Sequence, residues 1–276
     1  MSRKPGVSAP LLLLCAMSLV PFAQALPGES CAVNPQVAAR ESEHGSAQTS
    51  GTVAEGQKCD PKFTYENQPE WGGQCVTGKM QSPVDIKSAR PAKLDPLEFG
   101  YQSGSLKIVN DCDHYRIKID FPGDSWLKIG KRSYRLVEFH FHEPAEDLID
   151  GKRAAMEVHL VHQTRDGFRA VVAVMVKPGA ENELIKTLWK NIPPRGDSRE
   201  FKDVKVDAND LLPKDRGFYT FPGSLTAPAC DQGIAWYVLK TPIEFSRDQI
   251  DEYKKYYANT ARRPQPANGR PILENQ

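Results

Sequence analysis

Four of the six histidines in this 276-residue sequence lie between positions 140 and 162, with a spacing that could hold a metal ion. His140 and His142 are two residues apart, so on a β-strand both imidazoles face the same side, roughly 6.6 to 6.8 Å apart. In the nearby segment 156–163, strand alternation places His159 on one face and His162 on the other. We expect His159 to join the pair, because Glu157 shares its face and can orient its ring. We expect His162 to be a buried core histidine.

Three neutral imidazoles with an open fourth position are the ligand set of a catalytic zinc ion, which lowers the pKa of its bound water to about 7. The sequence therefore predicts Zn²⁺ as a cofactor. Geometry alone leaves an alternative open, because a single strand histidine is more often packed or hydrogen-bonded than a metal ligand.

The elements that must position these histidines are short strands. From Pro61 to the C-terminus, apolar and polar residues alternate in runs separated by turn residues, which predicts a mainly β domain with short helices. The expected strands include residues 106–110, 114–121, 134–142, 156–163 and 170–176. Helices are expected at residues 181–191 and from Ser246, which can form a capping box with Gln249, towards Tyr257.

The N-terminal region differs in composition from the rest of the chain. Residues 1–25 combine a short basic start, an apolar stretch and Ala23-Gln24-Ala25, which is typical of a secretory signal peptide. Residues 26–60 are rich in small and polar residues and are expected to form a flexible leader, followed by one domain at residues 61–276. The protein is therefore expected to be exported to the periplasm or the extracellular space.

Charge and hydropathy argue against two classes of partner. Residues 1–25 contain one of the Arg and one of the Lys residues, so 34 of the 36 basic residues remain against 35 acidic ones. A nearly neutral chain without a basic cluster argues against nucleic acid as a partner. After the signal segment, no long apolar run suggests a membrane span.

Five cysteines remain after the signal segment, and an oxidising compartment would allow them to form disulfides. They are Cys31, Cys59, Cys75, Cys112 and Cys230. Because the number is odd, at least one must be free or must pair between chains. Spacing does not assign the pairs, and a disulfide-linked homodimer remains open.

Several motifs resemble those of the α-class carbonic anhydrases, in order along the chain. They are Gln81–Ile86, Glu138–Glu146, Met156–His162, Phe221–Pro228 and the closing Gln265–Arg270. The resemblance implies a single domain around a large, twisted, mostly antiparallel sheet, with zinc at the base of a conical cleft. It also implies reversible hydration of carbon dioxide to bicarbonate and a proton, by attack of zinc-bound hydroxide.

The resemblance also implies roles for individual residues. It makes His140, His142 and His159 the zinc ligands, Thr226 the hydroxyl beside the zinc-bound hydroxide, and Glu146 the acceptor that orients Thr226. A threonine hydroxyl that donates to a carboxylate has only lone pairs left, so the hydroxide must donate to it and aim its own lone pair at the substrate.

Further positions match the outer contacts and the substrate wall of the family. Glu157 matches a carboxylate that orients His159. Glu138 stands where the family commonly has glutamine and is expected to accept from His140, while its negative charge should make the bound water slightly less acidic. Carbon dioxide is apolar, and the positions that would line its pocket are Val161, Val171, Leu225, Ile234 and Trp236.

Two further expectations follow from the resemblance. In many exported relatives the positions of Cys75 and Cys230 are bridged, so we expect a disulfide between them. Ungapped alignment puts Asp113 at the position of the family's proton shuttle, and strand alternation would turn the adjacent His114 away from the cleft. His114 is therefore expected to be an inefficient shuttle unless a bulge shifts the register.

Two other functions remain as alternatives. The same zinc chemistry could support a hydrolase that acts on esters. The fold could also serve as a non-catalytic binding module, although such relatives typically lose a zinc ligand, and this sequence keeps all three histidines together with Thr226 and Glu146.

Overall fold

The computed structural model describes residues 59–121 and 123–276. The expected signal peptide and residues 26–58 of the expected leader lie outside this range. The helices are η1 Gln68–Trp71, α1 Gly73–Thr77, α2 Glu183–Lys190, η2 Ala208–Leu211 and α3 Arg247–Tyr256. The strands are β1 Asp85–Ile86, β2 Arg90–Ala92, β3 Leu97–Gly100, β4 Gly104–Asp111, β5 Arg116–Asp120, β6 Trp126–Ile129, β7 Arg132–His142, β8 Leu148–Ile149, β9 Lys152–Arg153, β10 Met156–Gln163, β11 Arg169–Pro178, β12 Ser198–Val206, β13 Phe218–Ser224, β14 Gln232–Phe245 and β15 Leu273–Asn275.

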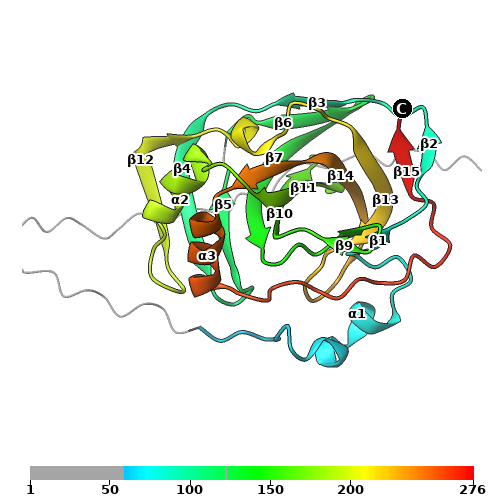
Figure 1. Cartoon of the computed structure of the whole chain (residues 1–276), viewed down its shortest axis with the longest axis horizontal. Coiled ribbons are helices and arrows are strands. Elements are labelled where there is room, and N and C mark those ends of the chain that lie inside the picture. The colour runs from blue at the N-terminus through cyan, green and yellow to red at the C-terminus, as the bar shows by residue number, and fades with distance from the viewer. Residues whose placement is uncertain (1–58, 122) are drawn as a thin grey trace, which may run out of the picture. The chain divides into compact units, whose positions relative to one another are not determined.

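Most strands belong to one large sheet, which dominates the molecule (Figure 1). Its order is β12-β4-β5-β7-β10-β11-β14-β13-β15-β2, and β6 joins it beside β7 and pairs with β3. The pairing is mostly antiparallel, as expected, but β11 and β14 run parallel, and so do β15 and β2. The sheet is therefore mixed. Strands β1, β8 and β9 form a second, three-stranded sheet.

The two longer helices form where the sequence predicts them. The Asn182 side chain accepts the backbone N–H of Ile185 and so caps α2. Ser246 and Gln249 form the predicted capping box of α3. The helices lie side by side, since the Trp189 indole on α2 donates to the carbonyl of Gln249 at 2.9 Å. Of the described helices, none is long and apolar enough to cross a membrane.

The central strands are buried on both faces, and strand alternation separates the two sets of side chains. One face of β7 and β10 carries Phe139, Phe141, Val158 and Leu160, which belong to the larger core cluster together with residues of α2 and α3. Because alternate residues point to opposite faces, the histidines at positions 140, 142 and 159 lie on the other face. Helices α2 and α3 thus pack on the face opposite the histidines, and the histidine face is left for the site.

One expected strand is shorter than the sequence suggests. Residues 114–121 were expected to be extended, but β5 begins only at Arg116, because Cys112–Tyr115 form the turn between β4 and β5. Tyr115 has a φ of 54°, in the left-handed region that turns use. Cys112 is also bonded to Cys59, which anchors this turn to the start of the described chain.

Candidate metal centre

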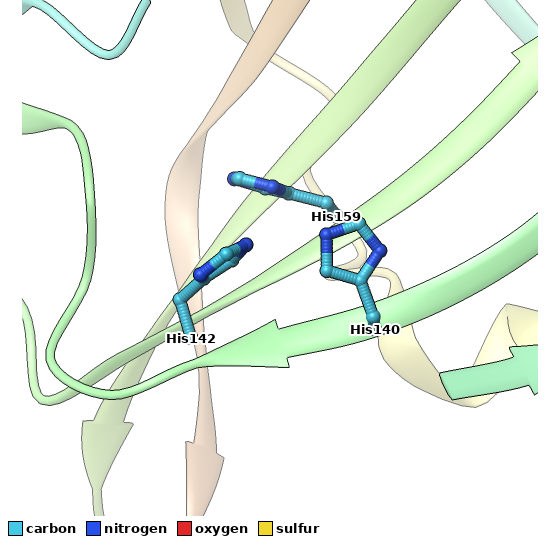
Figure 2. Close-up of side chains that lie close together, drawn as sticks. All are labelled: His140, His142 and His159. Atoms are coloured by element: carbon cyan, nitrogen blue, oxygen red, sulfur yellow. The ribbon is translucent and has the colours of Figure 1, made fainter. Parts of the chain in front are cut away.

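Three buried histidines converge on one point of the sheet (Figure 2). His140 and His142 come from β7, and His159 lies directly opposite His140 on β10. One ring nitrogen from each lies within 4.8 Å of the others, and all three side chains are buried. This is the group that the sequence singled out, brought together by the i, i+2 spacing and the antiparallel register.

Outer contacts fix the orientation of each ring. The Nδ1 atom of His140 lies 3.0 Å from Glu138 Oε2, and Nδ1 of His142 donates to the backbone carbonyl of Thr260 at 2.7 Å. For His159 the outer nitrogen is Nε2, which lies 3.2 Å from Glu157 Oε1. The remaining nitrogens, Nε2 of the first two rings and Nδ1 of the third, are then free to bind a metal. Such outer partners set the tautomer of a ligating histidine.

The protonation of two of the three rings suits metal binding. Burial lowers the pKa of His140 and of His142 well below the usual value, so both rings are neutral at pH 7 and keep a lone pair. Burial also disfavours charge on His159, but Glu157 outweighs it and raises the pKa of that ring. Within the described chain, the buried Nε2 of His142 has no hydrogen-bond partner and is available to a metal ion.

Thr226 and Glu146 lie beside the histidines. Nε2 of His142 is 3.4 Å from Glu146 Oε2, and Glu146 is completely buried. Burial raises the pKa of this carboxyl to about 7, whereas His159, a hydrogen bond from Thr226 and the backbone N–H of Arg262 act to lower it. The carboxylate therefore contacts both the metal site and the hydroxyl that the sequence assigned to it.

Glu157 connects the ligands with the segment that carries Glu146. Its Oε2 accepts the backbone N–H groups of Glu146 at 2.7 Å and of Asp147 at 2.9 Å, while its Oε1 faces His159. One buried carboxylate thus positions both the third histidine and the loop after β7.

The histidines form part of the wall of a cavity of about 310 Å³. Of the apolar residues expected there, four line it: Val161, Val171, Leu225 and Trp236. Ile234 does not line this cavity. It lies one pleat beyond Trp236 on β14 and opposite Arg169, whose longer side chain reaches the cavity instead. A larger hollow of about 910 Å³ beside Trp126 and Phe168 contains none of the three histidines.

His162 has the structural role that alternation predicted. It is completely buried on the opposite face, and its Nε2 lies 2.7 Å from the hydroxyl of Tyr101. Burial lowers its pKa to about 3, so the ring is neutral within the core.

The expected orientation of His114 is wrong. Its side chain lines the cavity, and its Nδ1 lies 3.0 Å from Asp111 Oδ1. Asp113 is exposed and accepts the backbone N–H of Asp60 at 3.0 Å. Alternation between adjacent residues applies to strands, whereas both residues lie in the turn before β5, where neighbouring side chains need not point to opposite sides.

Two arginines that the sequence reasoning missed support the site. Arg116 on β5 lines the cavity and contacts His140. Arg262 is buried, its backbone N–H donates to Glu146 at 2.8 Å, and its guanidinium donates to Gln81 and to the carbonyls of Ser82 and Cys75. The available signal for Arg116 was its position two residues after His114, where the chain enters a strand that pairs with β7. Nothing in the local sequence marked Arg262.

A disulfide joins Cys75 to Cys230, the pair expected from the resemblance. Cys230 follows the loop that carries Thr226, and Cys75 lies on α1. Nε2 of Gln81 donates to the carbonyl of Cys230 at 3.1 Å, so a hydrogen bond adds to the disulfide in bracing this loop. Cys59 and Cys112 form a second disulfide, which the sequence did not assign.

A mixed β-sheet with three convergent histidines in the wall of a partly apolar cavity defines a zinc-dependent enzyme class rather than a structural zinc site, because the ligand set leaves a coordination position open. Comparisons identify the family. The model of the eukaryotic-type carbonic anhydrases matches residues 66–276, and the chain belongs to this family. It is therefore a zinc enzyme that hydrates carbon dioxide.

Individual relatives agree with this assignment. Carbonic anhydrase from Pectobacterium carotovorum is 37% identical over 236 residues, which cover 85% of this chain and 92% of that protein. The solved α-carbonic anhydrase of Photobacterium profundum has 37% identity and a TM-score of 0.69, covering 72% of this chain and 91% of its own. A hyperthermostable carbonic anhydrase from a hydrothermal vent chimney has 35% identity and a TM-score of 0.74. The match covers 78% of this chain and 99% of that chain.

Proposed function

We propose that His140, His142 and His159 hold the zinc ion of this carbonic anhydrase. The observation that carries the proposal is their convergence with one nitrogen each turned inward, while Glu138, Thr260 and Glu157 occupy the outer nitrogens. Zinc bound there supplies the Lewis acidity that makes its water a nucleophile near neutral pH.

We further propose that Thr226 and Glu146 orient the attacking oxygen. Glu146 already accepts the backbone N–H of Arg262 at Oε1 and lies beside the hydroxyl of Thr226. If Thr226 donates its proton to Glu146, its oxygen has only lone pairs left and must accept a hydrogen bond from the nucleophile. This fixes the direction from which the nucleophile attacks.

The wall of the cavity supports a small apolar substrate. Val161, Val171, Leu225 and Trp236 give carbon dioxide an apolar surface beside the histidines, and no charged cradle is needed for a neutral molecule. The product, bicarbonate, is charged and is poorly solvated by this wall, which favours its release to water.

Export of the protein remains a proposal that rests on the N-terminal sequence and on two disulfides. Four of the five cysteines outside residues 1–25 are paired, which is typical of proteins that fold in an oxidising compartment. We propose cleavage after Ala25 and folding in the periplasm or outside the cell.

The matched variants His159→Ala and His162→Ala test the zinc site. The first should lose stoichiometric zinc and carbon dioxide hydration together, because it removes a ligand. The second should keep stoichiometric zinc, because it removes a core residue on the opposite face of the same strand. Metal analysis of the purified proteins, together with stopped-flow hydration, decides the matter. Zinc retained by the first and lost by the second would refute the ligand assignment.

The two alternatives predict different results in the same assays. A non-catalytic binding module would contain zinc but would not hydrate carbon dioxide. An esterase would show ester hydrolysis far more efficient than hydration. Neither alternative accounts as directly for a cavity whose apolar wall adjoins the inward nitrogens of the three histidines.

A further inference from the structure

Arg116 lies against the outer side of His140, a contact that nothing in the ligand set requires. Its Nη1 is 3.6 Å from Glu138 Oε1 and 3.3 Å from Nδ1 of His140. On its other side, its Nε donates to Asp111 Oδ2 at 3.2 Å. The guanidinium is thus held between two carboxylates, one of which accepts from a metal ligand.

The sequence suggested that Glu138 would add negative charge near the metal. An uncompensated carboxylate in this position is costly, since only 11% of its side chain is exposed. The guanidinium of Arg116 lies 3.6 Å from Oε1 of this carboxylate. The neighbouring Lys118 pairs instead with Asp120, at 2.8 Å. Arg116 is therefore the ionic partner of this carboxylate.

We propose that Arg116 is a positioning residue that neutralises Glu138, so that Nδ1–H of His140 donates to a charge-compensated carboxylate, and that this pairing sets the zinc affinity of the site. The inference rests on the proposed three-histidine zinc site. The two charges have opposite signs and both adjoin the same ring, so their fields largely cancel at the metal.

This arrangement predicts opposite effects for the two single variants. Arg116→Gln leaves the negative charge of Glu138 uncompensated, which attracts a dication, so zinc should bind about tenfold more tightly. Glu138→Gln removes the negative charge nearest the ligand, while the guanidinium stays paired with Asp111, so zinc should bind about tenfold more weakly. The double variant has neither charge, and its zinc affinity should return to within about threefold of wild type.

Zinc affinity is measured by competition with a chromophoric chelator at one pH and one ionic strength, which does not depend on catalytic activity. Lys118→Gln is the matched control, because Lys118 lies on the same strand as Arg116 but its positive charge pairs with Asp120. It should change the affinity by less than about threefold. Arg116→Lys, which keeps the positive charge, should also remain within about threefold of wild type.

Several results would overturn the proposal. If both single variants weaken zinc binding and the double variant shows the sum of their effects, Arg116 has only a packing role. Equal effects of Lys118→Gln and Arg116→Gln would show a general field rather than a specific pair. If Arg116→Gln does not fold, the double variant becomes decisive: it should fold and bind zinc normally, and its failure would show that the guanidinium is needed independently of Glu138. Absence of stoichiometric zinc in the wild type would instead refute the proposed function itself.

Discussion

At the scale of single residues, each of the three histidines is oriented by the group that contacts its outer ring nitrogen. His140, His142 and His159 each have one nitrogen held by a carboxylate or a carbonyl, so their rings are oriented before metal binds. The same principle extends to Glu146, which receives the backbone N–H of Arg262. Preorganised groups do not have to pay an ordering cost when the reaction takes place.

The hydroxyl of Thr226 should be needed for catalysis but not for metal binding. Thr226→Val keeps the side-chain volume and removes the hydrogen bonds to Glu146 and to the nucleophile. We expect kcat/KM for hydration to fall by about 100-fold, the usual cost of one lost orienting hydrogen bond, with zinc still stoichiometric. Stopped-flow kinetics and metal analysis of the same sample test this. A variant with wild-type kcat/KM would remove Thr226 from the mechanism.

The buried, neutral His162 should make folding sensitive to acid. Its pKa is about 3 in the folded chain, against about 6.5 when exposed. Between these values only the unfolded chain binds the proton, so the stability falls as pH falls, by about 3 kcal/mol from pH 8 to pH 4 for this residue. His162→Gln cannot titrate. It should be less stable than wild type at pH 8 but should lose about 3 kcal/mol less on acidification.

Urea unfolding of the metal-free proteins at the two pH values measures this difference. Using metal-free protein removes the contribution of zinc release, and the remaining titrating groups are common to both proteins. An equal loss of stability in the two proteins would mean that His162 is protonated in the folded state.

At the scale of elements, the turn between β4 and β5 determines which histidine faces the cavity. A strand over residues 114–121, as the sequence predicts, would turn His114 away from the cavity. In the structure the turn brings His114 to the cavity wall, with its Nδ1 fixed by Asp111 and 47% of its side chain exposed. A histidine in contact with both the cavity and water is suited to carry a proton between them.

We therefore expect His114 to relay protons out of the site. His114→Ala should reduce kcat several-fold at low buffer concentration but leave kcat/KM almost unchanged, because proton release follows the attack on carbon dioxide. Added imidazole should restore kcat. Asp113→Ala is the matched control, since Asp113 is the adjacent turn residue and does not line the cavity. No buffer dependence in His114→Ala would exclude the relay.

The two disulfides should differ in their contribution to stability. Cys75–Cys230 closes a loop of 155 residues, whereas Cys59–Cys112 closes one of 53. On the chain-entropy model the longer loop is worth about 1 kcal/mol more. Replacing both cysteines of a bridge by serine should therefore lower the free energy of unfolding more for Cys75–Cys230 than for Cys59–Cys112, as measured by chemical unfolding. Only Cys75→Ser/Cys230→Ser should also reduce kcat/KM, since that bridge braces the loop of Thr226. The reverse ranking would show that native-state strain outweighs loop entropy.

At the scale of the whole molecule, the sequence was informative where chemistry and periodicity coincide. The i, i+2 histidines, the face shared by His159 and Glu157, and the capping box of α3 all depend on local spacing, and the structure contains each of them. Ile234 and Arg262 could not be placed in this way. Their positions depend on cross-strand register and on contacts between segments more than 100 residues apart, which local patterns do not encode.

The cysteine inventory gives a prediction for the protein cleaved after Ala25, as proposed above. Cys59, Cys75, Cys112 and Cys230 are paired, so Cys31, which lies outside the described residues, is the remaining cysteine after residue 25. Thiol titration of the denatured, unreduced mature protein should give one thiol per chain, and none in Cys31→Ser. If the wild type has no thiol and migrates at twice its mass without reductant, Cys31 links two chains.

A segment far along the chain makes the site a late product of folding. The carbonyl of Thr260 holds His142, and the backbone N–H of Arg262 holds Glu146. Both residues lie at least 101 positions after His159, the last of the three histidines. The unfolded chain therefore contains all the ligands, but they are oriented only after this distant segment has docked on the sheet. Truncation at residue 259 should yield a protein that captures zinc poorly although every ligand is present.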